Sequence, residues 1–120
     1  MTRRPPRRNR ELRLPRYQAP GAKVESFLGL ARRAGALTFG RSACLRAVQA
    51  GRCKLLVLAQ GAGSSAERDS GGGPKVPVLL SELTKDELGQ RLGRASVAVV
   101  GMTDVDLARG LLQTATLLAE

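Results

Sequence analysis

Histidine and tryptophan are absent from this 120-residue chain, and cysteine is scarce. Without histidine, the sequence excludes a Ser-His-Asp or Cys-His catalytic group and any histidine metal ligand. The two cysteines, Cys44 and Cys53, lie nine residues apart and cannot by themselves complete a zinc site. We therefore expect two reduced, buried thiols, and neither a metal nor a cofactor.

Aromatic residues and long apolar runs are also scarce. The chain has two Phe and one Tyr, which argues against the stacking surfaces that many single-strand RNA and DNA binders use. No apolar run approaches the roughly 20 residues of a membrane span. The beginning of the chain is rich in Arg and Pro, unlike a signal peptide. We expect a cytoplasmic protein with no membrane partner.

Positive charge is what the chain has in excess, with 20 Lys and Arg against 10 Asp and Glu. Residues 1–22 contain seven basic residues and one acidic residue, and residues 23–60 repeat these numbers. Residues 61–120 contain six basic and eight acidic residues, so the positive field belongs to the first half of the chain. A polyanion, most naturally a nucleic acid, is the expected partner.

Residues 1–22 are expected to form a disordered Arg- and Pro-rich arm. Pro5, Pro6, Pro15 and Pro20 prevent a continuous helix, and few apolar residues are present to stabilise an ordered state. Such an arm can bind phosphates through counterion release, but it reads no sequence. The folded domain is expected to span residues 23–120.

Apolar periodicity in residues 23–120 predicts helices that alternate with short strands. Helices are expected from Lys23 to near Gly35, over residues 41–50 and 84–92, and from Thr103 along an apolar stripe to Leu118. The expected strands are 36–39, 54–59, 76–80 and 97–102. The Gly- and Ser-rich stretch 61–74 is the least structured part, with one or two helical turns at most. This order predicts an α/β protein, a three-layer α/β/α sandwich with a four-stranded mixed sheet.

Few residues point to catalysis. The spacing Gly61-x-Gly63-x-x-Ala66 loosely matches a dinucleotide-binding fingerprint, but glycines at 71–73 break the helix that this fingerprint needs. Asp104 and Asp106 lie at a helix start, where acidic residues stabilise the helix without any catalytic role. The sequence therefore indicates a non-enzymatic protein without a small-molecule substrate. An enzyme that binds a nucleotide phosphate through residues 61–65 is a weaker alternative.

One predicted helix start combines the features of an anion site. Gly40-Arg41-Ser42-Ala43 opens this helix, and Arg46 lies one turn later on the same face as Ser42. The N–H groups at a helix start and a nearby Arg can bind a phosphate or an RNA backbone. The periodicity is equally consistent with an ordinary amphipathic helix whose polar face is solvated.

Residues 26–59 resemble the kink-turn RNA-binding superfamily of ribosomal proteins found in archaeal and eukaryotic large subunits. The stretch looks closest to the bacterial YlxQ-type branch. The family places Gly-x-Asn-Glu-x-x-Lys-Ala at the start of its second helix, then a Gly and an apolar strand. The residues in register are Gly40, Arg46, Ala47, Gly51 and Ala59. Residues 87–100 match the family's fourth helix, recognition loop and last strand, so the resemblance covers about residues 23–109.

The resemblance implies an α/β/α domain that docks on structured RNA through two sites. These are the start of the second helix and the loop before the last strand. Carried over to this chain, the first site is Gly40, Arg41, Ser42, Ala43 and Arg46, and the second is Arg94, Ala95, Ser96 and Val97. Ser42 and Ala43 replace the family's Asn-Glu pair, which reduces the reading of base edges, whereas Arg46 keeps the phosphate-type contact.

The function predicted on these grounds is non-enzymatic binding of structured RNA, a kink-turn or a related element, by a ribosomal-protein-like monomer. The implied partner is ribosomal RNA, and the implied role is in the ribosome or in translation. The alternative is a protein–protein interaction module on the same fold, which would use the acidic second half of the chain as its working surface.

Overall fold

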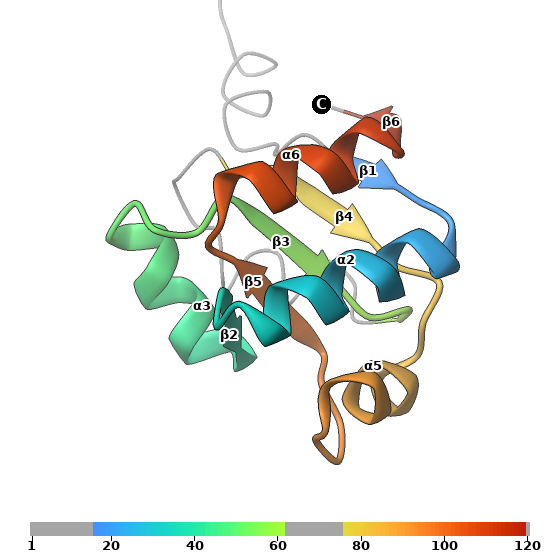
Figure 1. Ribbon diagram of the computed structural model, residues 1–120, viewed down its shortest axis with the longest axis horizontal. Helices are drawn as coiled ribbons and strands as arrows, with labels where there is room; N and C mark the ends of the chain where they lie inside the picture. Colours follow the sequence, from blue (N-terminus) through green and yellow to red (C-terminus); the bar gives the residue numbers. More distant parts are fainter. Residues whose placement is uncertain (1–15, 62–75, 120) are drawn as a thin grey trace, which may run out of the picture.

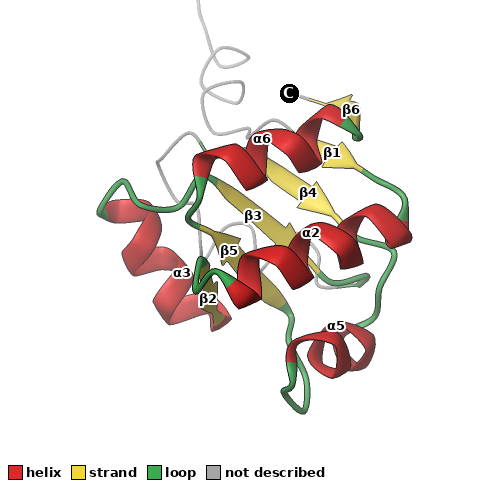
Figure 2. Cartoon of the chain, in the orientation of Figure 1, coloured by secondary structure: helices red, strands yellow, loops and turns green. Residues whose placement is uncertain are grey.

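In the computed structural model, the described residues are 16–61 and 76–119. They form four helices and a six-stranded mixed sheet (Figures 1 and 2). The helices are α2 (Gly21–Arg33), α3 (Gly40–Gln49), α5 (Lys85–Leu92) and α6 (Val105–Gln113). The strands are β1 (Arg16–Gln18), β2 (Leu37–Phe39), β3 (Leu55–Leu58), β4 (Val78–Leu80), β5 (Val99–Met102) and β6 (Thr116–Ala119). Residues 1–15 of the expected arm, and nearly all of the Gly- and Ser-rich stretch, lie outside the described residues.

The strands of the sheet lie in the order β2-β5-β3-β4-β1-β6. β4 pairs in parallel with both β3 and β1, whereas the β2–β5, β3–β5 and β1–β6 pairs are antiparallel. All four residues of β3 are buried. This burial confirms the prediction that the apolar run at 54–59 forms a strand covered on both faces.

Side chains of β3 alternate between two hydrophobic clusters, one on each face of the sheet. Leu55 and Val57 pack with apolar residues of α2, α5 and α6, whereas Leu56 and Leu58 pack with those of α3. Figure 1 shows α2 and α6 lying across one face of the strands. Helices therefore cover both faces, and none of the described helices is long and apolar enough to cross a membrane.

The sheet contains two strands more than the four that the sequence predicts, and the first of them is β1. β1 and the beginning of α2 lie within the segment 1–22 that was expected to be disordered. β1 is held by main-chain pairing with β4 on one side and β6 on the other. Such pairing needs no apolar periodicity in the strand itself, which is why the sequence pattern missed it. The described fold begins at Arg16 rather than at Lys23.

The second additional strand is β6, where the sequence predicts the end of a helix. α6 ends at Gln113, and the Thr114 hydroxyl donates to the Leu111 carbonyl at 2.7 Å. The apolar stripe correctly marks Leu111 as a core residue, but Leu118 is 49% exposed on β6. Pairing with β1, about one hundred residues away in sequence, decides the structure of this last segment.

Candidate functional site

The start of α3 is exposed to solvent, and the strand that precedes it fixes its position. β2 pairs with β5 and places Phe39 at the N-cap of α3 with extended backbone angles. Gly40 follows with φ +86°, a conformation that side-chain-bearing residues rarely adopt. No side chain caps the helix, and its first turn contains no acidic residue. The positive end of the helix dipole is therefore not neutralised from within the helix.

The buried face of α3 determines which residues of the first predicted site reach the surface. Cys44 and Ala47 are fully buried against the sheet. Gly40, Arg41, Ser42 and Arg46 are exposed, while Ala43 is half-buried. The first predicted site thus forms an exposed strip along one side of α3, with Ala43 at its margin.

Two buried thiols lie in the cluster between α3 and the sheet, beneath this strip. Both cysteines are unpaired and buried, as the sequence predicts. A Cβ atom on Gly101 of β5 would lie 3.1 Å from Cys53 Sγ and 3.4 Å from Cys44 Sγ, so a glycine is needed here for close approach. Burial raises the pKa of the Cys44 thiol and raises that of Cys53 to about 11. Both thiols belong to the hydrophobic cluster between α3 and the sheet.

The loop between α5 and β5 contains the second predicted site. Gly93 is the C-cap of α5 and has φ +72°, and the Arg94 N–H donates to the Gly89 carbonyl at 2.7 Å. Arg94, Ala95 and Ser96 are exposed. Val97 is 4% exposed and belongs to the main core cluster, so it does not share a surface with the other three.

A contact between Arg94 and Phe39 joins the two predicted sites. The guanidinium carbon of Arg94 lies 3.9 Å from the centroid of the Phe39 ring. Because Phe39 is the N-cap of α3, this contact places the loop directly beside the helix start. Figure 1 shows both segments at the same end of the molecule. Sequence reasoning missed Phe39, although it is one of three aromatic residues and immediately precedes the Gly40 motif.

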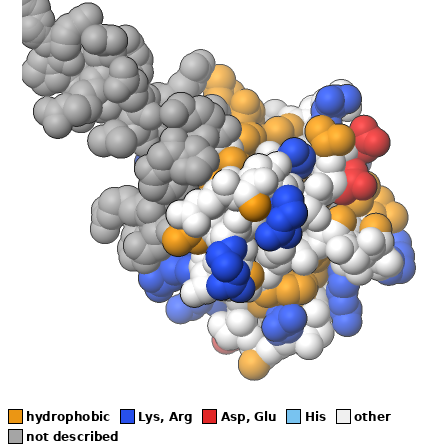
Figure 3. Space-filling model, turned by 90° about the vertical axis from the view of Figure 1, so that its left-hand side faces the viewer, with side chains coloured by type: hydrophobic (Ala, Val, Ile, Leu, Met, Phe, Trp, Pro, Cys, Tyr) orange, Lys and Arg blue, Asp and Glu red, His pale blue; other side chains and the backbone are white. Residues whose placement is uncertain are grey.

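A third arginine extends the surface along α2. A Cβ atom on Gly93 would lie 2.7 Å from Nη2 of Arg32, so this guanidinium lies against the residue next to Arg94. Within residues 16–61 and 76–119, Arg32, Arg46 and Arg94 form no ion pair, whereas Arg91 pairs with Glu25 at 3.1 Å. Figure 3, which looks onto the side of α3, shows several Lys and Arg side chains across this side and acidic ones towards its rim. We call Arg32, Phe39, Gly40, Ser42, Arg46 and Arg94 the α3 surface.

Within the described part of the chain, no group of three or more His, Cys, Asp and Glu residues could hold a metal ion. Asp104 and Asp106, which the sequence predicts to lie at a helix start, are at the beginning of α6. The Asp104 carboxylate accepts from the N–H groups of Asp106 and Leu107 at 2.8 and 3.0 Å. This confirms that Asp104 caps the helix.

The solved structures that match the chain include a Bacillus halodurans protein whose function is given as unknown. It is 32% identical, with a TM-score of 0.69, and the match covers 78% of this chain and 96% of that one. This chain belongs to the same family. The match extends over nearly the whole bacterial protein, so the two chains share the α/β fold described above.

A second solved structure shares the fold at greater distance. The Giardia lamblia 15.5kD RNA binding protein is 16% identical, with a TM-score of 0.58, and the match covers 78% of this chain and 85% of that one. At this identity the likeness shows the fold alone. No protein-family model and no curated protein matches the chain.

Proposed function

We propose that this chain is a non-enzymatic protein that binds structured RNA through the α3 surface. The observation that carries the proposal is the packing of Arg94 on Phe39, which joins the two motifs that resemble the kink-turn RNA-binding superfamily. Two motifs separated by about 50 residues in sequence thereby form one continuous surface. A common partner for both motifs explains this arrangement more economically than two unrelated solvated segments.

The electrostatics of the surface suit a phosphate backbone. The start of α3 has no acidic residue in its first turn, and Arg46 follows one turn later on the exposed side. Glu25 is the single acidic residue among residues 23–60, and Arg91 neutralises it. Phosphate contacts from Arg side chains and helix N-termini position a protein on nucleic acid and supply much of its affinity.

Recognition of RNA shape rather than base sequence is the mode that these residues favour. Ser42 can exchange one hydrogen bond with a base edge or a ribose, and Ala43 can exchange none. The shared fold with an RNA binding protein of Giardia supports RNA as the polyanion. The specific form of the proposal is a kink-turn or related element, bound by a ribosome- or translation-associated member of the YlxQ-type branch. The Arg-rich residues at the beginning of the chain would add non-specific affinity.

A binding titration with the full chain tests this proposal. The RNAs are a kink-turn and a straight duplex of equal length, each at two salt concentrations. We expect tighter binding to the kink-turn. Equal affinity would contradict kink-turn recognition but not RNA binding, and no binding to either RNA would contradict the proposed function.

The matched variants are Arg46→Ala and Arg109→Ala, which remove the same charge from two exposed positions. Arg46 belongs to the α3 surface, whereas Arg109 lies on α6, which packs on the other face of the sheet. We expect Arg46→Ala to weaken binding about tenfold and to lower the salt slope by about one, since one phosphate contact is lost. Arg109→Ala is expected to leave both quantities near their original values. Equal losses in the two variants would show that net charge, rather than the α3 surface, determines binding.

A further inference from the structure

We propose that Arg32 of α2 is a phosphate-binding residue, so that a helix outside the two predicted sites takes part in RNA binding. This inference rests on the proposed function, and it adds a contact that neither predicted site contains. Arg32 and Arg33 are adjacent, exposed and both in the last turn of α2. The sequence does not distinguish them, whereas the fold directs only Arg32 towards the α3 surface.

The two arginine side chains leave α2 in different directions, because consecutive residues of a helix are about 100° apart around its axis. A Cβ atom on Gly93 would lie 2.7 Å from Nη2 and 3.3 Å from Cζ of Arg32, so this guanidinium crosses to the C-cap of α5. A Cβ atom on Gly29 would lie 3.9 Å from Nη1 of Arg33, so that side chain runs back along α2. Of the two cations, Arg32 is therefore the one beside the loop that contains Arg94.

Arg32 and Arg94 are neighbouring cations without a counter-ion in the described part of the chain. One lies against Gly93, and the other follows Gly93 in the sequence. Neither side chain forms an ion pair or a hydrogen bond with another described residue, and Glu25, the acidic residue of α2, pairs with Arg91 instead. Like charges that lie close together repel each other, and a bound anion relieves that repulsion. An RNA phosphate is an anion of this kind, and the planar guanidinium group suits its oxygens.

Gly93 leaves the space that the Arg32 guanidinium occupies. Its φ of +72° favours glycine, and a side chain there would in addition push against the end of the Arg32 side chain. Asparagine adopts this left-handed backbone region more readily than most residues do. Gly93→Asn is therefore expected to displace the Arg32 guanidinium without removing its charge, which gives a second way to perturb the same contact.

The test compares two adjacent positions that have the same charge. The unmodified full chain, Arg32→Gln and Arg33→Gln are each titrated with the kink-turn RNA and with the straight duplex, at two salt concentrations. We expect Arg32→Gln to weaken RNA binding about fivefold and to lower the salt slope by about one, since one phosphate contact is lost. Arg33→Gln should leave both quantities near those of the unmodified chain. Arg32→Lys keeps the charge and should retain the salt slope.

The salt slope separates a phosphate contact from a merely structural role. Weaker binding of Arg32→Gln with an unchanged salt slope would show that Arg32 only supports the loop, and would overturn the inference. Equal losses in Arg32→Gln and Arg33→Gln would also overturn it, because net charge would then explain both.

Gly93→Asn provides a check that leaves the charge of the chain unchanged. We expect it to weaken RNA binding by itself and to add no further loss to Arg32→Gln, and urea denaturation shows whether each variant is folded. An unmodified chain that binds neither RNA would overturn the proposed function together with this inference. RNA binding that is unchanged in Arg32→Gln would overturn the inference alone.

Discussion

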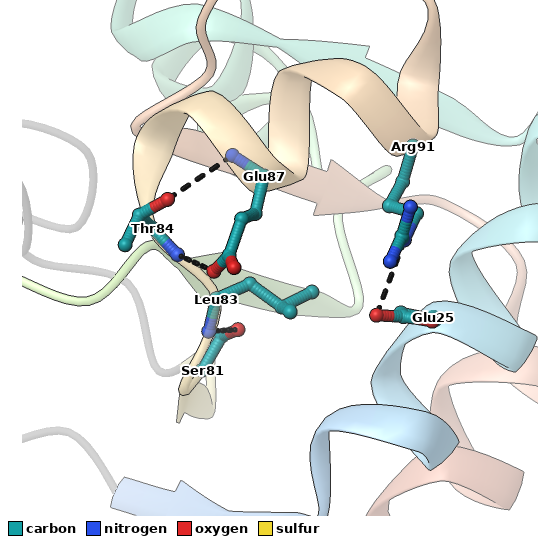
Figure 4. A network of polar contacts seen from close by, with 6 residues as sticks. All are labelled: Glu25, Ser81, Leu83, Thr84, Glu87 and Arg91. Carbon is teal, nitrogen blue, oxygen red and sulfur yellow. Dashed lines mark hydrogen bonds and ion pairs between the residues drawn. The ribbon is translucent and has the colours of Figure 1, made fainter.

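The start of α3 is built differently from the starts of α5 and α6. At α5, the Thr84 hydroxyl accepts from the Glu87 N–H at 3.1 Å, and the Glu87 carboxylate accepts from the Thr84 N–H at 2.8 Å (Figure 4). At α6, Asp104 accepts from two N–H groups. At α3, the N-cap is Phe39, whose side chain accepts no hydrogen bond.

The start of α2 also lacks a side-chain cap and an acidic first turn, so the missing cap alone does not mark a binding site. Under the proposed function, the caps of α5 and α6 serve stability, whereas the start of α3 serves binding. A side-chain cap and an acidic first turn satisfy the N–H groups and neutralise the dipole, which stabilises the helix by about 1 kcal/mol. The same groups would repel a phosphate. Because α3 is uncapped, it lacks this stabilisation. Packing of Cys44, Ala47 and Val48 against the sheet holds the helix in place instead. Substitutions at the two kinds of helix start should therefore have different effects.

The largest effect on stability is expected at Gly89 of α5. A Cβ atom there would lie 2.7 to 2.9 Å from backbone atoms of Arg94, Ala95 and Ser96, which cannot move aside as a flexible side chain could. Gly89→Ala should lower the free energy of unfolding by about 2–3 kcal/mol, measured by urea denaturation.

The matched control is Gly29→Ala in α2, where the nearest atom to a new Cβ is Arg33 Nη1 at 3.9 Å. This substitution should stabilise the protein by about 0.5–1 kcal/mol, because alanine is the better helix former. A Gly89→Ala protein as stable as the original would show that the loop does not pack on α5 as described.

The second largest effect is expected when α3 is made to resemble α5 and α6. Ser42 is the third residue of α3, so Ser42→Asp places a carboxylate in the first turn. We expect this variant to be more stable by about 0.5 kcal/mol, owing to the helix dipole, and to bind RNA about tenfold more weakly.

Ser42→Asn is neutral and similar in shape to Ser42→Asp, and it restores the Asn that the resembled family has at this position. It should leave stability nearly unchanged and should not weaken RNA binding. Chemical denaturation measures the stability of both variants, and RNA titration measures their affinity. Asp and Asn variants with equal RNA affinity would remove the start of α3 from the binding surface.

A smaller effect, confined to stability, is expected from removing the caps. Thr84→Ala and Asp104→Ala should each lower the free energy of unfolding by about 1 kcal/mol, because N–H groups in the first turn of the helix lose their acceptor. RNA affinity should stay the same in both. Ser42→Ala serves as the control with no cap to lose, and a stability loss there as large as at Thr84 would contradict the contrast between the helix starts.

The smallest expected effect is a loss of stability that occurs only at alkaline pH. Burial raises the pKa of Cys53 from its ordinary value of 9.0 to about 11. The folded state therefore retains the proton that the unfolded state loses above pH 9, and stability should fall as pH rises from about 9 to 11. Cys53→Ala should show a shallower decline over this window in thermal unfolding. An identical decline in the variant would assign the pH dependence to other groups.

Local patterns predicted the middle of this fold well. The strands β2, β3, β4 and β5 and the capping box at α5 all lie where apolar periodicity and cap residues indicate. These features depend on neighbours within a few residues. β1 and β6 were missed because each is stabilised by pairing with a strand distant in sequence, and no local pattern records such pairing.

The residues of the candidate site fall into the same two groups, those that a local motif predicts and those that only the fold identifies. The sequence alone marked Gly40, Ser42, Arg46 and Arg94, because their order along the chain matches a recognisable motif. It also grouped Val97 with them, whereas the fold buries that residue in the core. No pattern in the sequence marked Phe39 or Arg32 as a candidate binding residue.

The sequence by itself determined the basic first half, the alternation of helices and strands, and the residue types available for binding. Only the tertiary structure decided that the two motifs meet, since the contact between Arg94 and Phe39 depends on β2 and β5 being neighbours in the sheet. The physical reason is that charge, periodicity and capping are properties of short segments. A surface built from two segments exists only once the sheet has brought them together.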